Sequence, residues 1–240
     1  MRNRLSISEI FGPVVQGEGP TQGRSAIFVR LGLCNLDCSW CDTPYTWDWT
    51  GKNGTVYDRA EELTSIDIEE IAEQILDLSQ SGRVERVVIT GGEPLIQQRR
   101  LLPLIADLTD RGFVIEIETN GTISPHPDLL LAGVRFNVSP KLPGSGVDSN
   151  RAIIPPAIDA LQAAQSEFKF VVADAGDLAE VEALVERFGI SPGRVWIMPE
   201  GTTHDRIISQ LPHLFGWAAV RGFNLSARLH VLAFDDRRGV

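Results

Sequence analysis

All three cysteines of this 240-residue chain lie within residues 34–41, with the spacing C-x3-C-x2-C. Thiolates gathered in one short loop favour a soft metal ion or a metal cluster. A closed zinc site and an ordinary iron–sulfur cluster each use four protein ligands. Because the chain has no fourth cysteine, a [4Fe–4S] cluster on these residues would keep one iron open to a small molecule.

Other interpretations of the cysteines stand beside this one. A structural zinc site would need a histidine as its fourth ligand, and the nearest along the chain is His126. Three unrelated buried thiols would rarely fall in one short window. An odd number of cysteines without a second group argues against a disulfide framework.

Charge and composition argue against several classes of protein. The net charge is −10 without a basic stripe, which argues against a polynucleotide substrate but not against a small one. No apolar run approaches the roughly 20 residues of a membrane span. Residues 1–6 are basic, but no long apolar region of the signal-peptide kind follows them. We therefore expect a cytoplasmic protein, where thiols stay reduced.

Strand-like and helix-like segments alternate along the chain, as expected of one α/β domain with a largely parallel sheet. About six strand–helix pairs are too few for an eight-fold barrel. Loops are expected at 12–23, 50–64 and 144–150. The expected strands are 6–11, 25–33, 86–90, 113–118, 135–138, 168–172, 195–198 and 228–232, and the expected helices are 67–79, 101–110, 156–165, 177–188 and 207–220, the last broken near Pro212.

Polar residues follow several expected strands at the ends where α/β sheets and barrels bind ligands. Gly91 and Gly92 follow strand 86–90 and would let a polar ligand approach the backbone. Glu116 and Glu118 share one face of strand 113–118 and form either a ribose site or a solvated face. Glu118 and Asn120 are further site candidates.

Three positions each allow two interpretations from the residues alone. The loop 12–23, with four glycines, either approaches a ligand or is a plain turn with a solvated Glu18. Arg30 interrupts an apolar strand, so it either faces water or binds an anion such as a carboxylate. Thr43 is either an oxygen ligand of the kind that Mg2+ accepts or part of a turn or cap.

The cysteine spacing resembles the cluster motif of the radical S-adenosylmethionine (SAM) superfamily, and Thr90-Gly91-Gly92-Glu93-Pro94 follows it as in that superfamily. Further segments resemble the 7-carboxy-7-deazaguanine synthase family. The likeness is good from about Ser8 to Lys141 and looser beyond. The segments are Glu9-Ile10-Phe11, Gln16-Gly17-Glu18-Gly19, Phe28-Val29-Arg30, Cys41-Asp42-Thr43, Glu118-Thr119-Asn120-Gly121-Thr122 and Ser139-Pro140-Lys141.

The resemblance implies a single radical SAM domain over residues 1–240, folded as an incomplete (β/α)6-type barrel. Its parts would be a cluster loop at 34–41, a glycine-rich substrate loop at 12–23 and a C-terminal extension at about 225–240. This family often has Gln-Pro where the chain has Met198-Pro199. The glutamine side chain is absent here, so contacts to SAM at this turn would come from the backbone. The implied ligands are Cys34, Cys38 and Cys41 for a [4Fe–4S] cluster and Thr43 for Mg2+; the implied substrate contacts are Val15, Gln16, Gly17, Arg30 and Thr90; and the implied SAM contacts are Trp40, Gly92, Ser139, Pro140, Lys141, Ile197, Met198, Pro199 and Glu200.

The implied activity is a radical SAM lyase that converts 6-carboxy-5,6,7,8-tetrahydropterin to 7-carboxy-7-deazaguanine with loss of ammonia, in the route to 7-deazapurines such as queuosine. No protein side chain is assigned to the chemistry itself, which the cofactor supplies. Expected partners are the pterin, an electron donor such as flavodoxin or ferredoxin, and a second copy in a homodimer, but no nucleic acid or membrane. The alternatives are another radical SAM enzyme, such as a glycyl-radical activase, and a structural zinc module.

Overall fold

The computed structural model describes residues 4–240, which form two compact units. Unit 1 comprises the described residues up to Val14, Ser25–Thr119 and Ile123–Phe136. Unit 2 comprises Val15–Arg24, Asn120–Thr122 and Asn137–Val240. The first half of the basic segment 1–6, for which no signal peptide was expected, lies outside the described residues.

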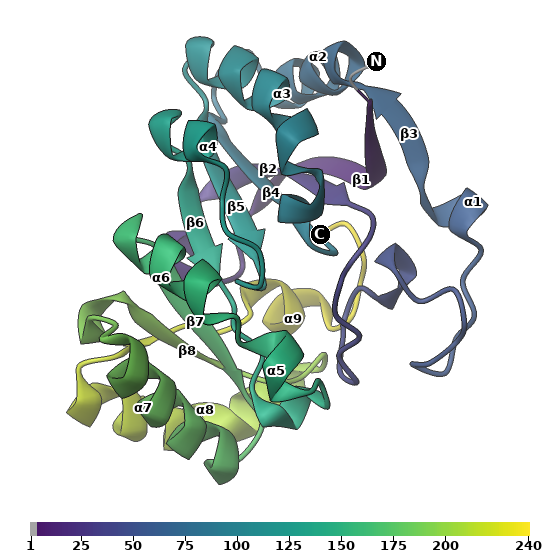
Figure 1. Ribbon diagram of the computed structural model, residues 1–240. Coiled ribbons are helices and arrows are strands. Elements are labelled where there is room, and N and C mark those ends of the chain that lie inside the picture. Colours follow the sequence, from purple (N-terminus) through teal and green to yellow (C-terminus); the bar gives the residue numbers. More distant parts are fainter. Residues whose placement is uncertain (1–3) are drawn as a thin grey trace. The chain divides into compact units, whose positions relative to one another are not determined.

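Unit 1 is built on strands in the order β3-β1-β2-β4-β5 (Figure 1). β2, β4 and β5 run parallel, whereas β3 pairs antiparallel with β1. The centre of β4 is apolar and fully buried, as expected of a parallel strand covered on both faces. The bounds are β1 Arg4–Val15, β2 Ser25–Leu31, β3 Thr64–Asp67, β4 Arg86–Gly91 and β5 Val114–Thr119.

Two longer helices, α2 (Ile68–Leu78) and α3 (Gln98–Asp110), pack against each other beside these strands (Figure 1). In α2 the buried residues Ile68, Ile71 and Ile75 recur at helical spacing, so one face of the helix joins the core. Shorter elements complete the unit: the helices α1 Arg59–Glu62 and α4 Pro127–Leu131, and the 3-10 turns η2 Pro44–Thr46 and η3 Pro94–Gln97.

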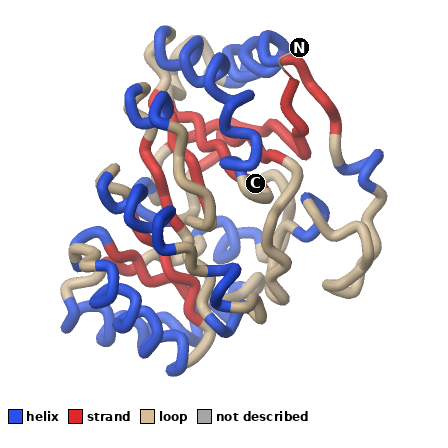
Figure 2. Tube along the Cα trace, in the orientation of Figure 1, coloured by secondary structure: helices blue, strands red, loops and turns tan. Residues whose placement is uncertain are grey.

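Unit 2 continues the alternation of strands and helices, which are red and blue in Figure 2. Its strands run parallel in the order β6-β7-β8-β9. Its strands are β6 Arg135–Val138, which crosses the division between the units, β7 Glu167–Val172, β8 Val195–Pro199 and β9 Asn224–Leu225. Its helices are α5 Ser149–Ala152, α6 Pro155–Ala163, α7 Ala175–Phe188, α8 His204–Arg221 and α9 Leu229–Phe234, with the 3-10 turns η1 Gly19–Thr21, η4 Pro143–Ser145 and η5 Pro192–Arg194. Over residues 4–240, every helix is too short or too polar to cross a bilayer.

The expected strands and helices are confirmed over most of the chain, with differences at three loops. β1 continues to Val15, so the loop expected at 12–23 begins later. The loop expected at 50–64 contains α1 and the start of β3, and the loop expected at 144–150 contains the end of η4 and the start of α5. These helical elements are only three or four residues long, which is too short for a periodic pattern to show.

Two expectations near the C-terminus are wrong. α8 runs without interruption through Pro212, because buried Ile207 and Leu214 anchor it on both sides of the proline. The strand expected at 228–232 is instead helix α9, which follows the two-residue strand β9. Alternation over five residues does not distinguish a strand from one helical turn, and here the Leu232 N–H donates to the Arg228 carbonyl at 2.9 Å.

Candidate functional site

The cysteine loop follows β2 in unit 1 and holds three free thiols. Cys38 is buried, whereas Cys34 and Cys41 are half-buried. The Leu36 N–H donates to the Cys34 Sγ at 3.5 Å, and the Trp47 indole N–H donates to the Cys41 Sγ at 3.3 Å. Hydrogen bonds to the charged form of a group favour that form, so both contacts assist a thiolate.

The donor set fits an iron–sulfur cluster better than a hard cation, because it consists of soft thiols. Burial raises the pKa of Cys34 to about 12 and also raises the pKa of Cys41. These thiols must therefore lose protons when a metal binds. Within residues 4–240, no three Cys, His, Asp or Glu side chains already stand together as a metal-ligand group.

The end of β4 supports the residue that enters the cysteine loop. A Cβ on Gly92 would lie 1.9 Å from the carbonyl oxygen of Leu33, so only glycine fits there. The Glu93 N–H donates to that same oxygen at 2.8 Å. Leu33 has φ 76°, which is uncommon for a residue with a side chain, and it directly precedes Cys34. Gly92 therefore has a packing role, while its contact with SAM stays a prediction.

A buried carboxylate organises the segment that follows the loop. Asp48 accepts backbone N–H bonds from Lys52 at 3.0 Å and from Asn53 at 2.7 Å. The Asn53 side chain donates to the Cys38 carbonyl at 3.1 Å, and the Lys52 ammonium pairs with Asp37. The turn built on Asp48 is thereby tied to the middle of the cysteine loop.

Arg30 binds a carboxylate, but one that belongs to the protein. Its Nε donates to Glu9 Oε1 at 2.6 Å, and both side chains are only 17% exposed. The Tyr45 hydroxyl donates to the same Glu9 oxygen at 3.1 Å, and the Phe11 ring lies 5.7 Å from the guanidinium carbon. The water-facing alternative for Arg30 is therefore wrong. Glu9 engages the Nε of the guanidinium.

The polar residues at the ends of β4 and β5 are joined to each other. Thr90 donates its hydroxyl to Glu118 at 2.8 Å. Glu116 is 1% exposed and pairs with Arg86, so a solvated face is wrong for that acid. Asn120, in unit 2, accepts from the Thr122 hydroxyl at 2.6 Å. The structure thus brings Thr90 and Glu118 together, and gives Asn120 a local turn partner.

In unit 2, Glu18 is the centre of a buried ion cluster. It pairs with Lys169, accepts from Arg228 Nε at 2.8 Å and lies 3.7 Å from His230 Nε2. Burial alone would raise the pKa of Glu18, but the charges of Lys169, Arg228 and His230 hold it well below its usual range. A plain turn with a solvated Glu18 is therefore wrong.

The residues predicted to contact SAM in unit 2 lie at the ends of β6 and β8. The Lys141 ammonium donates to the Ser139 hydroxyl at 3.0 Å. Glu200 follows β8 and pairs with Arg206 at 3.3 Å. These positions are consistent with the expected strand ends, and the contacts themselves remain predictions. The SAM contacts predicted for Pro140, Ile197, Met198 and Pro199, and for the half-buried Trp40 of the cysteine loop, also remain predictions.

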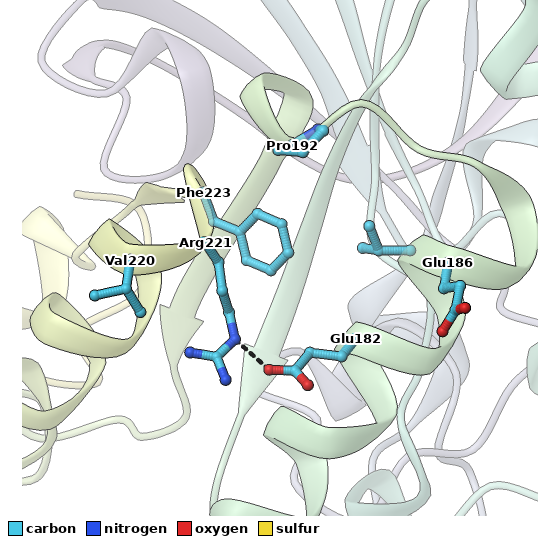
Figure 3. A pocket seen from close by; sticks show the side chains of 7 residues that line it. Glu182, Glu186, Pro192, Val220, Arg221 and Phe223 are labelled. Carbon is cyan, nitrogen blue, oxygen red and sulfur yellow. Dashed lines mark hydrogen bonds and ion pairs between the residues drawn. The ribbon is translucent and has the colours of Figure 1, made fainter.

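A groove of about 540 Å³ opens between α7 and the end of α8 (Figure 3). Arg221 pairs with Glu182 across it, and the Phe223 ring forms part of its apolar wall. No residue predicted to bind metal, SAM or substrate lines this groove. The candidate residues of each unit therefore lie outside this groove.

Sequence reasoning missed several residues that support the site. Lys169 interrupts the apolar strand β7, which is the same signal that singled out Arg30. Asp48 lies between two tryptophans just before a glycine, so its capping role had only a weak turn signal. Arg228 carried no local signal, and Glu9 appeared only within the segment Glu9-Ile10-Phe11 without a role, because their partners are distant along the chain.

Comparisons with known proteins agree with these observations. Residues 29–143 match the model of the radical SAM superfamily. The chain is 37% identical to 7-carboxy-7-deazaguanine synthase of Pyrobaculum aerophilum, over 98% of this chain and 97% of that protein. It is 33% identical to the protein of the same name from Rhodopirellula baltica, over 98% and 88% of the two chains.

Solved structures show the same likeness. The crystal structure of QueE from Escherichia coli matches with a TM-score of 0.69 and 26% identity, over 93% of each chain. Streptococcus suis SuiB, bound to its precursor peptide SuiA, matches with a TM-score of 0.54 but only 14% identity, over 81% of this chain and 46% of SuiB. The SuiB match indicates a shared fold alone.

The contact between Gly92 and Leu33 predicts the effect of a single methyl group. Gly92→Ala should destabilise the protein by about 1–3 kcal/mol, the usual cost of overpacking, and should lower the iron retained after cluster reconstitution. Thermal unfolding and iron analysis measure both effects. Gly216→Ala is the control, because a Cβ there meets open space. An unchanged melting temperature and unchanged iron content in Gly92→Ala would contradict the supporting role.

Proposed function

The chain belongs to the 7-carboxy-7-deazaguanine synthase family of radical SAM enzymes, and on that premise we propose that it converts 6-carboxy-5,6,7,8-tetrahydropterin to 7-carboxy-7-deazaguanine with loss of ammonia. Family membership rests on 37% identity over nearly the whole of both chains. It confirms the predicted fold class, the incomplete (β/α)6-type barrel, and the enzyme class, a radical SAM lyase. A glycyl-radical activase and a zinc module are not favoured by these relatives.

The observation that carries the proposal is the loop of three thiols next to β4. A [4Fe–4S] cluster and SAM are the cofactors of this enzyme class, and the bound cluster supplies the electron that cleaves SAM. Cys34, Cys38 and Cys41 would hold the cluster, and three protein ligands leave one iron for SAM. The N–H groups of Leu36 and Trp47 stabilise two of the thiolates.

Arg30 is well placed to bind the carboxylate of the pterin. Glu9 fixes the guanidinium through Nε, and Phe11 lies against it. A guanidinium held in this way can present its planar edge to a second carboxylate in two parallel hydrogen bonds. Prior fixing also lowers the entropy that binding costs. Val15, Gln16, Gly17 and Thr90 complete the proposed substrate contacts.

Several finer features belong to the proposal and rest on family resemblance. Thr43 would bind Mg2+ together with the substrate; its hydroxyl lies 3.7 Å from the Cys41 Sγ, beside the cluster loop. The electron donor would be a flavodoxin or ferredoxin, and the enzyme would act as a cytoplasmic homodimer. Residues 1–240 would work as one radical SAM domain, with Ser139, Lys141 and the turn at 197–200 contacting SAM.

The direct test is turnover by the reconstituted enzyme. We expect the anaerobically reconstituted protein, given SAM, a reductant and 6-carboxy-5,6,7,8-tetrahydropterin, to form 7-carboxy-7-deazaguanine detectable by mass spectrometry. Omitting Mg2+ should slow product formation. SAM cleavage without this product would support a radical SAM activity but contradict the proposed pterin substrate. A colourless protein that holds zinc would contradict both the radical SAM activity and the substrate.

Replacing Thr43 tests the proposed Mg2+ site. Thr43→Ala should weaken the dependence of turnover on Mg2+ while leaving SAM cleavage largely intact, because the hydroxyl is lost and the cysteines remain. Thr43→Ser keeps a hydroxyl oxygen and should preserve the dependence. Turnover is titrated with Mg2+ for each variant. Loss of SAM cleavage in Thr43→Ala would show that the residue supports the cluster instead.

Replacing Arg30 tests the proposed carboxylate contact. Arg30→Ala should raise the KM for the pterin roughly tenfold to hundredfold, the equivalent of about 1.5–3 kcal/mol for hydrogen bonds to a charged group. Steady-state kinetics measure this change. Competition by a tetrahydropterin without the carboxylate is the control and should be similar in both proteins. An unchanged KM for the substrate would return Arg30 to a structural role with Glu9.

A further inference from the structure

The segment that carries the proposed substrate residues Gln16 and Gly17 is fastened to distant parts of unit 2. Its own residues, 16–23, read QGEGPTQG and include no large apolar side chain. Hydrophobic burial therefore contributes little to its position. Backbone bonds close the segment on itself, since Gln16 N–H donates to the Arg24 carbonyl and Gly23 N–H to the Gln16 carbonyl, each at 2.8 Å.

The residues that follow β9 supply polar contacts along this segment. The Leu229 N–H donates to the Gly17 carbonyl at 3.0 Å, and the Gly19 N–H donates to the Ser226 hydroxyl at 2.8 Å. A Cβ on Gly17 would lie 2.1 Å from Nδ1 of His230, so the histidine ring packs directly on the glycine backbone. Residues 226–230 thus lie alongside residues 17–19 of the segment.

Between these backbone contacts lies the buried charge cluster of Glu18. Lys169 of β7 binds one carboxylate oxygen, and Arg228 binds the other through Nε at 2.8 Å. Both cationic residues are only 7% exposed. Arg228 also donates from a terminal nitrogen to the Gly201 carbonyl at 2.6 Å, which fixes its plane. Glu18 is therefore held from two elements at once.

Glu18 is also connected to a substrate residue directly. Its backbone N–H donates to the side-chain oxygen of Gln16 at 3.1 Å. Fixing Glu18 thus orients the Gln16 amide as well as the Gly17 backbone. Neutralising Glu18 would leave Lys169 and Arg228 buried without their carboxylate, which is strongly unfavourable. The segment would then move so that water reaches those charges.

We propose that Glu18, Lys169 and Arg228 form a latch that positions Gln16 and Gly17 for the substrate, so that the C-terminal residues 226–230 are part of the framework of the substrate site. The proposal rests on the proposed function for the role of Gln16 and Gly17. Glu18, Lys169 and Arg228 act here as positioning residues, through the segment 16–23, and not by contact with the reacting atoms.

The kinetic test replaces one charge with an isosteric amide. Glu18→Gln should raise the KM for 6-carboxy-5,6,7,8-tetrahydropterin at least tenfold, while the KM for SAM and the iron content change less than twofold. The matched control is Glu182→Gln, the same change in the Glu182–Arg221 pair beside the groove of Figure 3, and should leave all three values unchanged. A pterin KM for Glu18→Gln within twofold of wild type would overturn the latch.

A double-mutant cycle separates positioning from independent contacts. Lys169→Met should also raise the pterin KM, and the double variant Glu18→Gln/Lys169→Met should be no worse than the poorer single variant, because both changes open the same latch. Effects that multiply in the double variant would mean that each residue acts on the substrate separately, and would overturn the proposal.

Hydrogen exchange tests the latch without substrate or cluster chemistry. In Glu18→Gln, the amides of residues 16–24 should exchange at least tenfold faster than in wild type, while those of β4 in unit 1 remain unchanged. Faster exchange throughout the protein, or none in the segment, would overturn the latch. If the wild type failed to convert the pterin, the proposed function would fall, and this exchange result would still decide whether the latch exists.

Discussion

The contact of the two glycines at the end of β4, Gly91 and Gly92, with the backbone of residues 31–33 is the constraint on which the cluster site depends. Cβ atoms at Gly91 and Gly92 would collide with the carbonyl groups of Leu31 and Leu33. Their absence lets two parallel strands end side by side with backbone against backbone. Two residues after β2 ends, the chain can then turn at Leu33 in a left-handed conformation and enter the cysteine loop.

Buried and half-buried carboxylates help to fix the segments around the site. Asp48 holds the turn behind the cysteine loop, Glu9 holds Arg30, and Glu93 accepts from Leu95 and Thr119. A carboxylate out of water is costly unless donors surround it, so each ties several backbone or side-chain groups to one point. Loops rich in glycine and polar residues gain a defined shape in this way.

Local sequence patterns predicted the features of this protein that neighbouring residues determine. The cysteine spacing, the glycines after β4 and most strands and helices could be read directly from neighbouring residues. The pairing of Glu18 with Lys169 and Arg228 could not, because it joins residues far apart in sequence whose burial only the fold determines. Helix α9 was mistaken for a strand because alternation over five residues does not distinguish a strand from a helical turn. The Leu229 N–H at its start donates to the distant Gly17 carbonyl, a contact that no local pattern shows.

Two ion pairs among the proposed substrate residues and their neighbours, Arg30 with Glu9 and Glu18 with its cations, differ in which hydrogen-bonding atoms they engage. In the pair of Arg30 and Glu9, the carboxylate engages Nε. A guanidinium can bind a second anion through its two terminal nitrogens. In the cluster of Glu18, each carboxylate oxygen already has a cationic partner. A ligand that displaced Lys169 or Arg228 from Glu18 would leave that charge buried without its carboxylate. On the proposed function, the same type of interaction would orient Arg30 for a substrate carboxylate, whereas at Glu18 it would hold the loop.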